Sequence, residues 1–71
     1  NDLEKIGWTI RKCRREQKMT QEVLAEKAGI DRPYLTNIEN GHKNPSIQVV
    51  LNISEALEIP PWRLLRDALE N

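Results

Sequence analysis

Two short helical segments separated by only a few residues constrain the fold of this chain more than any other feature. Thr20 and Asp31 are good N-cap residues, and Gly29 and Gly41 are typical of helix ends, so the pattern predicts helices over residues 20–29 and 31–41. The residues that permit close contact at the joint and fill the corner are Ala25, Ala28, Gly29, Ile30, Leu35 and Ile38. Because so few residues separate the two helices, they must cross sharply rather than form an antiparallel hairpin.

Three further helices are predicted around this helix-turn-helix pattern, which covers residues 21–40. Apolar residues recur at helical spacing in residues 3–17 and 46–57, and a last helix follows Pro60 and Pro61 over residues 61–69. The two apolar stripes are Leu3, Ile6, Ile10 and Cys13, and Ile47, Val50, Ile53 and Leu57. No segment alternates apolar and polar residues over a useful length, so we expect a compact, all-α, five-helix domain that spans residues 1–71.

Composition excludes several classes of protein. One cysteine, Cys13, and one histidine, His42, cannot form an internal disulfide or a Cys/His zinc set, and a single free thiol fits the reducing cytoplasm. The longest apolar run, residues 49–51, is too short to cross a membrane. The chain has no Ser/His/acid set, metal cluster or phosphate-binding glycine loop, and five short helices leave little room for a pocket. We therefore expect no enzymatic activity, cofactor, metal or small-molecule effector.

Charge is distributed unevenly along the chain. The 71 residues carry 11 basic and 11 acidic side chains, yet residues 5–43 hold nine Lys or Arg against five Asp or Glu. Attraction of an anion depends on the local field rather than on the total charge. The neutral net charge of the chain therefore does not exclude a nucleic-acid partner, because residues 5–43 carry an excess of basic side chains.

Short motifs in register along residues 6–65 resemble those of one known family. The matching residues are Ile6-Gly7, Ile10-Arg11, Arg14, Met19-Thr20-Gln21, Leu24-Ala25, Ala28-Gly29-Ile30, Ile38-Glu39-Asn40-Gly41, Asn44-Pro45-Ser46-Ile47, Ala56-Leu57 and Ile59. Together they resemble the lambda/434-repressor-like (Xre-type) helix-turn-helix family. The chain departs from the usual family pattern at Cys13, at Glu58, where glycine is common, and at Pro33, where the family often has a polar base-reading side chain.

The resemblance implies a lambda-repressor-like DNA-binding domain of five helices. Its third helix, here residues 31–41, would enter the major groove of double-stranded DNA, usually as part of a two-fold dimer. The resemblance also implies a structural pair between Arg14 and Glu39, which would hold the reading helix at a fixed angle.

The outward positions of the 31–41 helix are the candidate base-reading residues, Arg32, Pro33, Thr36 and Asn37. Arg32 can donate a fork of N–H groups to guanine and Asn37 can pair with adenine, each worth about 1–3 kcal/mol of discrimination. Thr36 can offer its methyl group to thymine or its hydroxyl to a base edge.

The candidate phosphate contacts surround these positions and comprise Arg11, Gln21, Tyr34, Asn40, His42, Lys43 and Asn44. Gln21 begins the first helix of the motif, where free N–H groups and the helix dipole favour a phosphate. The Tyr34 hydroxyl suits a phosphate better than a base edge.

Residues 46–57 and 61–69 carry more apolar surface than one core needs. The surplus residues form a candidate dimer interface, which consists of Val49, Leu51, Trp62, Leu65 and Leu69. Trp8 is a further apolar residue on the polar face of the first helix, where it can pack on neighbouring arginine stems or meet a partner. A somewhat apolar monomer, or a terminus cut from a longer chain, is the alternative.

We therefore expect a cytoplasmic, sequence-specific transcriptional regulator that binds a palindromic operator as a homodimer. Half-sites would lie about 34 Å apart, one helical turn of DNA. The alternative is a protein-binding adaptor or antitoxin-type module that uses the same helical domain, which the neutral charge and the apolar last helix favour.

Overall fold

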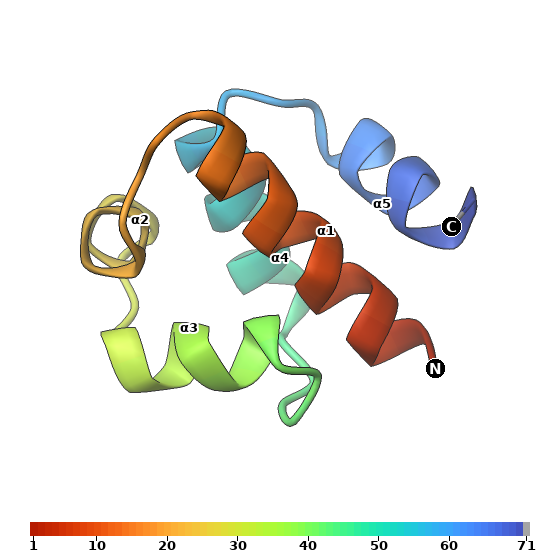
Figure 1. The fold of residues 1–71 in the computed structure, drawn as a ribbon, viewed down its shortest axis with the longest axis horizontal. Coiled ribbons are helices and arrows are strands. Elements are labelled where there is room, and N and C mark those ends of the chain that lie inside the picture. Colours follow the sequence, from red (N-terminus) through yellow and green to blue (C-terminus); the bar gives the residue numbers. More distant parts are fainter. Residues whose placement is uncertain (71) are drawn as a thin grey trace.

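Five α-helices make up residues 1–70, which are the residues that the computed structural model describes (Figure 1). The helices are α1 (Asp2–Glu16), α2 (Gln21–Ala28), α3 (Arg32–Glu39), α4 (Ile47–Ala56) and α5 (Pro61–Glu70). No strand occurs within residues 1–70. The expected all-α, five-helix fold is therefore confirmed.

Side-chain caps start four of the five helices. Thr20, Asp31 and Ser46 each accept a hydrogen bond from the backbone N–H three residues later, at 3.1, 2.7 and 3.1 Å respectively. These bonds satisfy N–H groups that have no partner inside the helix. Asn1 and Glu4 form a reciprocal capping box at the start of α1, which the sequence reading did not identify.

Left-handed backbone at two glycines ends α2 and turns the chain after α3. Gly29 has φ 73° and Gly41 has φ 76°, a region that residues with a Cβ rarely adopt. Gly41 also lies against α1, because a Cβ at this position would be 3.0 Å from the Cα of Glu4. Gly29 therefore allows the sharp crossing of α2 and α3, while Gly41 brings the following loop back to the start of α1.

One apolar core joins the helices. In Figure 1, α1 runs diagonally between α3 and α5, and it packs against both, while α2 packs against α3 and α4. The largest fully buried apolar side chains are Ile10, Leu24, Leu35, Ile38, Ile53, Leu57 and Leu64. Cys13 is half-buried against this core, as expected for a small core residue, and its burial raises the pKa of the thiol.

Gly7 permits a close approach between the backbones of α1 and α3. A Cβ on Gly7 would collide with the carbonyl oxygen of Ile38 and lie 2.6 Å from the carbonyl oxygen of Glu39. Both are backbone atoms of α3, which cannot move aside as a flexible side chain can. The glycine therefore lets α1 pack directly on the end of α3.

One expectation for the core is wrong. The apolar stripe of residues 46–57 predicts that Ile47 is buried with Val50, Ile53 and Leu57, but its side chain is 74% exposed. Ile47 is the first residue of α4, so its position precedes the part of the helix that lies over the core. Helical spacing predicts which face of a helix is apolar but not how far that helix extends beyond its neighbours.

Candidate nucleic-acid interface

A buried ion pair fixes the end of α3 to α1. Arg14 Nε donates to Glu39 Oε2 at 2.8 Å and Arg14 Nη2 donates to Glu39 Oε1 at 3.1 Å. Both residues are buried, and Arg14 Nη1 also donates to the carbonyl oxygen of Met19 at 2.8 Å. The guanidinium therefore connects α1, the loop before α2 and α3 through three charge-assisted hydrogen bonds.

Gln21 extends this network to the outer face of α3. Its Nε2 donates to Glu39 Oε1 at 3.0 Å, and its Oε1 accepts a hydrogen bond from Thr36 Oγ1 at 2.9 Å. Gln21 and Thr36 are both half-buried. The network Arg14–Glu39–Gln21–Thr36 thus holds α2 and α3 in one relative orientation. The Arg14–Glu39 pair agrees with what the family resemblance implies. Sequence reasoning missed the two bonds of Gln21, because no local pattern pairs residues that lie 18 or 15 positions apart.

The candidate base-reading residues share the outer face of α3. Arg32 and Pro33 are exposed, while Thr36 and Asn37 are half-buried. The opposite face of the helix, Leu35 and Ile38, belongs to the core. Pro33 falls in the first turn, where its missing N–H costs no helical hydrogen bond. The structure therefore brings these four residues together along one side of the helix.

Most candidate phosphate contacts lie in the loop that follows α3. Asn40, His42, Lys43 and Asn44 are exposed, and the N–H of His42 donates to the carbonyl oxygen of Asn37 at 2.8 Å, which folds the loop back on the helix. The remaining candidates come from the three helices of the network: Arg11 from α1, Gln21 from α2 and Tyr34 from α3.

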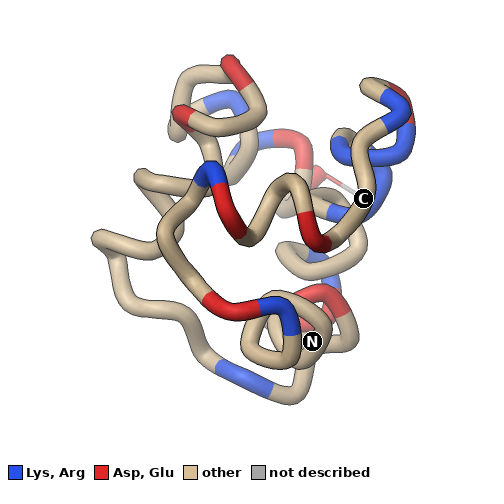
Figure 2. Tube along the Cα trace, turned by 90° about the vertical axis from the view of Figure 1, so that its left-hand side faces the viewer, with Lys and Arg blue, Asp and Glu red and all other residues tan. Residues whose placement is uncertain are grey.

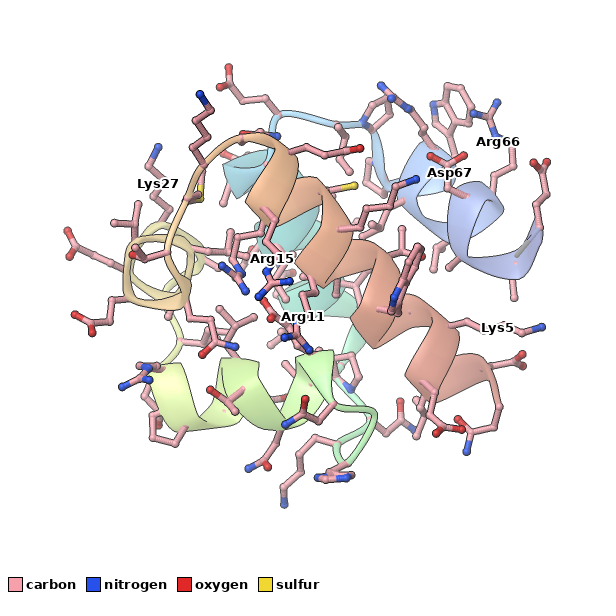
Figure 3. All side chains as sticks on the ribbon, in the orientation of Figure 1. Lys5, Arg11, Arg15, Lys27, Arg66 and Asp67 are labelled. Carbon is pink, nitrogen blue, oxygen red and sulfur yellow. The ribbon has the colours of Figure 1, made fainter. Side chains whose placement is uncertain are left out.

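These remaining candidates differ in how they are held. Arg11 is exposed, and in Figure 3 its side chain extends from the middle of α1 toward α3, with Arg15 beside it. The ring of Tyr34 is half-buried against the core. One N–H of the Gln21 amide donates to Glu39, so a second N–H of the same group is left for a phosphate.

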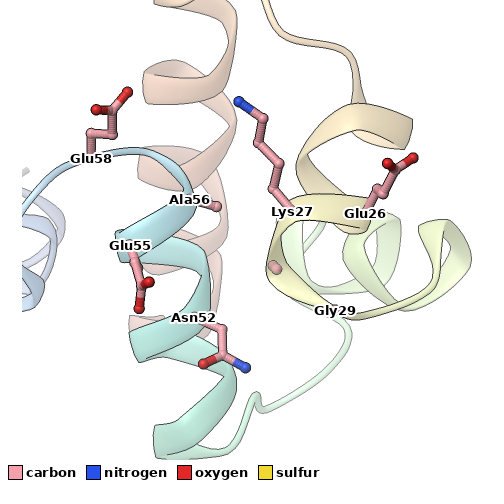
Figure 4. A pocket seen from close by; sticks show the side chains of 8 residues that line it. Glu26, Lys27, Gly29, Asn52, Glu55, Ala56 and Glu58 are labelled. Carbon is pink, nitrogen blue, oxygen red and sulfur yellow. The ribbon is translucent and has the colours of Figure 1, made fainter.

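The charge of the described surface is mixed in sign. Figure 2 shows Lys and Arg interspersed with Asp and Glu along the trace. A hollow of about 500 Å³ lies between the ends of α2 and α4 and is lined by the carboxylates of Glu26, Glu55 and Glu58, beside Lys27 (Figure 4). Three carboxylates repel a phosphate, so this hollow is no part of the candidate interface.

Apolar side chains are exposed away from α3. Trp62 and Leu69 on α5 are 62% and 58% exposed, and Leu51 on α4 is also exposed. Leu65 and Val49 are half-buried, and Val49 packs against the core, so it offers less surface than expected. Because α5 lies on the far side of α1 from α3 in Figure 1, a partner on α5 and a ligand on α3 would not compete.

Two tryptophans are covered in part by cations. The Lys12 ammonium lies 5.6 Å from the ring centre of Trp8, and the Arg66 guanidinium lies 5.3 Å from that of Trp62. Such contacts stabilise an exposed ring by about 0.5–1 kcal/mol. The cation over Trp8 is therefore a lysine and not one of the arginines that the sequence predicts as its support.

Other kinds of site find no support in the described residues. Within residues 1–70, no group of three or more His, Cys, Asp or Glu side chains is placed to hold a metal ion. None of the five helices is both long and apolar enough to span a bilayer.

Comparison with known proteins shows that this chain is similar to transcriptional regulators. The model of the Helix-turn-helix family HTH_3 matches residues 10–61. The chain is 40% identical over 57 residues to the uncharacterized HTH-type transcriptional regulator YqaE of Bacillus subtilis, which covers 80% of this chain and 49% of YqaE. It is 43% identical over 54 residues to the immunity repressor protein of Bacillus phage phi105, which covers 76% of this chain and 38% of the repressor. The chain thus spans half or less of the length of these two relatives.

A solved structure agrees over nearly its whole length. The restriction-modification controller protein C.AhdI from Aeromonas hydrophila superposes with a TM-score of 0.87 and is 38% identical in sequence. The match covers 89% of this chain and 96% of the controller chain. The arrangement of the five helices is therefore shared with a regulator of similar size.

Proposed function

The chain belongs to the HTH_3 helix-turn-helix family of lambda-repressor-like proteins, and we propose that it regulates transcription by reading double-stranded DNA with α3 in the major groove. The supporting observation is the network of Arg14, Glu39, Gln21 and Thr36, which holds α3 rigidly while its outer face stays open. A reading helix held in one orientation can match hydrogen-bond donors to base edges without an added cost of ordering.

The residues on the outer face of α3 and the residues around them have different roles. Arg32, Thr36 and Asn37 face base edges, and Pro33 adds apolar contact in the first turn of α3. The residues around them contact phosphates and fix the register of the protein on the duplex: Arg11, Gln21, Tyr34, Asn40, His42, Lys43 and Asn44. We propose that it acts in the cytoplasm, the reducing compartment that its free thiol, Cys13, fits.

The exposed apolar side chains suggest that two copies bind together. We propose that Leu51, Trp62, Leu65 and Leu69, with a smaller part for Val49, form a two-fold interface. A single α3 offers few base contacts, whereas two copies read two half-sites of a palindrome. The names of the relatives, an immunity repressor and a transcriptional regulator, support the regulatory role.

Selection of duplexes from a random library tests the proposal. We expect enrichment of a palindrome with half-site centres about 34 Å apart, and affinity for it that falls steeply with added salt because phosphate contacts release counterions. Enrichment of no sequence, together with no binding to random duplexes at low salt, would contradict the proposal.

A second candidate, a protein-binding adaptor or antitoxin-type module, draws on the neutral net charge and the exposed side chains of α5. The same experiment separates the two functions. An adaptor would bind no duplex even at low salt, although its α5 surface would still be available to a protein partner.

A further inference from the structure

The hydrogen-bond network that orients α3 also determines which way the Thr36 hydroxyl points. Glu39 is the fixed point of this network. Its carboxylate accepts two hydrogen bonds from Arg14, so it is held as an anion that can only accept. Any group that approaches the same carboxylate must therefore do so with a donor.

Gln21 is the group that approaches, and Glu39 decides the orientation of its amide. The Gln21 side chain lies between Glu39 and Thr36, at 3.0 Å and 2.9 Å. Because Glu39 requires a donor, the NH₂ group of Gln21 must face Glu39 and its carbonyl oxygen must face Thr36. The opposite orientation would set the amide oxygen against the carboxylate and is excluded by chemistry rather than by the positions of the atoms alone.

The orientation of the Gln21 amide determines how the Thr36 hydroxyl can bond. An amide oxygen can only accept, so the single hydroxyl proton of Thr36 is donated to Gln21. Among residues 1–70, no second hydrogen bond of this hydroxyl is described. What Thr36 has left for a ligand on the outer face of α3 is a lone pair on Oγ1 and its methyl group.

We propose that Thr36 acts as a hydrogen-bond acceptor that selects a base with an exocyclic amino group, and that Gln21 and Glu39 are positioning residues that set this polarity. This inference rests on the proposed function. In the major groove, adenine N6 and cytosine N4 carry such amino groups, whereas guanine O6 and thymine O4 are acceptors that a lone pair repels. An isolated Thr36 hydroxyl could donate to a base or accept from one, whereas the hydroxyl bound to Gln21 can only accept.

The base that depends on Thr36 is found by competition binding. Every single-base substitution of the selected duplex is measured with the wild-type chain, with Thr36→Val, which keeps the shape and loses the hydroxyl, and with Thr36→Ser, which keeps the hydroxyl. We expect one position per half-site where the wild-type chain and Thr36→Ser prefer adenine or cytosine by about threefold to tenfold, the range of one net hydrogen bond, and Thr36→Val does not.

Base analogues test the acceptor role on the unaltered protein. Replacement of that adenine by purine, or of that cytosine by 2-pyrimidinone, removes only the exocyclic amino group. Affinity of the wild-type chain should fall by the same factor, and affinity of Thr36→Val should not change. The measurement on the wild-type chain does not depend on whether any variant folds.

Gln21→Met tests the positioning role. Methionine has a similar length, but its thioether sulfur is only a weak acceptor for the Thr36 proton, so the hydroxyl becomes largely free to donate to a base. The preference for an amino-bearing base should weaken, and guanine or thymine should gain relative affinity at that position. Because the readout is a ratio between bases, a uniform loss of affinity from a lost phosphate contact would not affect it.

The outcomes distinguish failure of the inference about Thr36 from failure of the proposed DNA-binding function. Specific binding in which Thr36→Val changes no base preference, or removes a preference for guanine or thymine, overturns the inference and leaves the proposed function intact. A wild-type chain that binds no duplex overturns both. In that case the Gln21 side-chain amide in the NMR spectrum still reports whether Glu39 and Thr36 hold it in one orientation.

Discussion

Gly7 of α1 and Glu39 of α3 meet through backbone atoms, with room for no Cβ: a carbon built on Gly7 would lie 2.6 Å from the Glu39 carbonyl oxygen. The side chain of the same Glu39 is bound by Arg14, seven residues further along α1. The end of α3 is therefore held against α1 twice, by a close backbone contact and by a buried ion pair. Each of these constraints can be removed separately.

Replacement of Gly7 by alanine should destabilise the fold even though alanine favours helices. The added methyl group meets carbonyl oxygens of α3, so the two helices must separate. We expect a loss of about 1–3 kcal/mol in the free energy of unfolding, measured by urea denaturation. Arg15→Ala, at an exposed position of the same helix, is the control and should change stability by less than about 0.5 kcal/mol. A Gly7→Ala variant as stable as the control would show that the approach is not tight.

Replacement of either partner of the Arg14–Glu39 pair alone should lower the free energy of unfolding more than replacement of both. A single Arg14→Met or Glu39→Met leaves a buried charge without its counter-ion, which costs about 3–5 kcal/mol. This is comparable to the total stability of a domain of this size, so the single variants should be largely unfolded at room temperature. The double variant buries no charge and should be folded, which its helical circular dichroism spectrum would show. A double variant less stable than either single variant would contradict this account.

The thiol of Cys13 should react slowly in the folded protein. Burial raises the pKa of Cys13, and the nearby carboxylates of Glu16 and Asp67 raise it further. Near pH 8 the folded thiol is then more protonated than the unfolded one, and only the thiolate reacts with iodoacetamide. Because the folded pKa is raised, the associated stability is present below the unfolded pKa and is lost as the pH rises above it. Alkylation as fast in buffer as in denaturing urea would contradict this assignment.

Leu69→Asp should convert a dimer to a monomer without loss of fold. Leu69 is exposed on α5, so a carboxylate there disrupts an apolar interface but not the core. Sedimentation equilibrium of the wild-type chain should fit a dimer, and that of Leu69→Asp a monomer. Val23→Asp is the matched control, since Val23 is also an exposed apolar residue but lies on α2. A monomeric wild-type chain, or equal dissociation of both variants, would argue against the α5 interface.

The local features of the fold were readable from the sequence, because helix ends are encoded by neighbouring residues. Thr20 caps the start of α2, and Gly29 and Asp31 fix the turn between α2 and α3; the sequence predicts all three. The arrangement of the five helices followed from the family resemblance rather than from the stripes alone. Residues three or four apart lie on one helix face in any fold, so spacing gives the face and not its partner.

The features that sequence reasoning missed depend on contacts between distant segments. Gly7 sits inside a helix, where glycine costs about 0.5–1 kcal/mol relative to alanine, and that cost was the available signal for a close approach. The bonds from Gln21 to Thr36 and Glu39 join α2 to α3 and follow from the crossing angle of the helices, which no residue pattern specifies. The exposure of Ile47 likewise depends on where α4 begins relative to the core.

The central claim, that α3 reads bases while its surroundings hold phosphates, is tested most directly by the ratio of affinities for a selected and a scrambled duplex. Arg32→Ala should weaken binding to the selected duplex by about 1–3 kcal/mol and leave the scrambled duplex nearly unchanged. Lys43→Ala, from the exposed loop after α3, should weaken both equally and reduce the salt dependence by about one phosphate contact. If Arg32→Ala instead lowers both affinities by the same factor, then the outer face of α3 does not read base sequence through Arg32, and the account is contradicted.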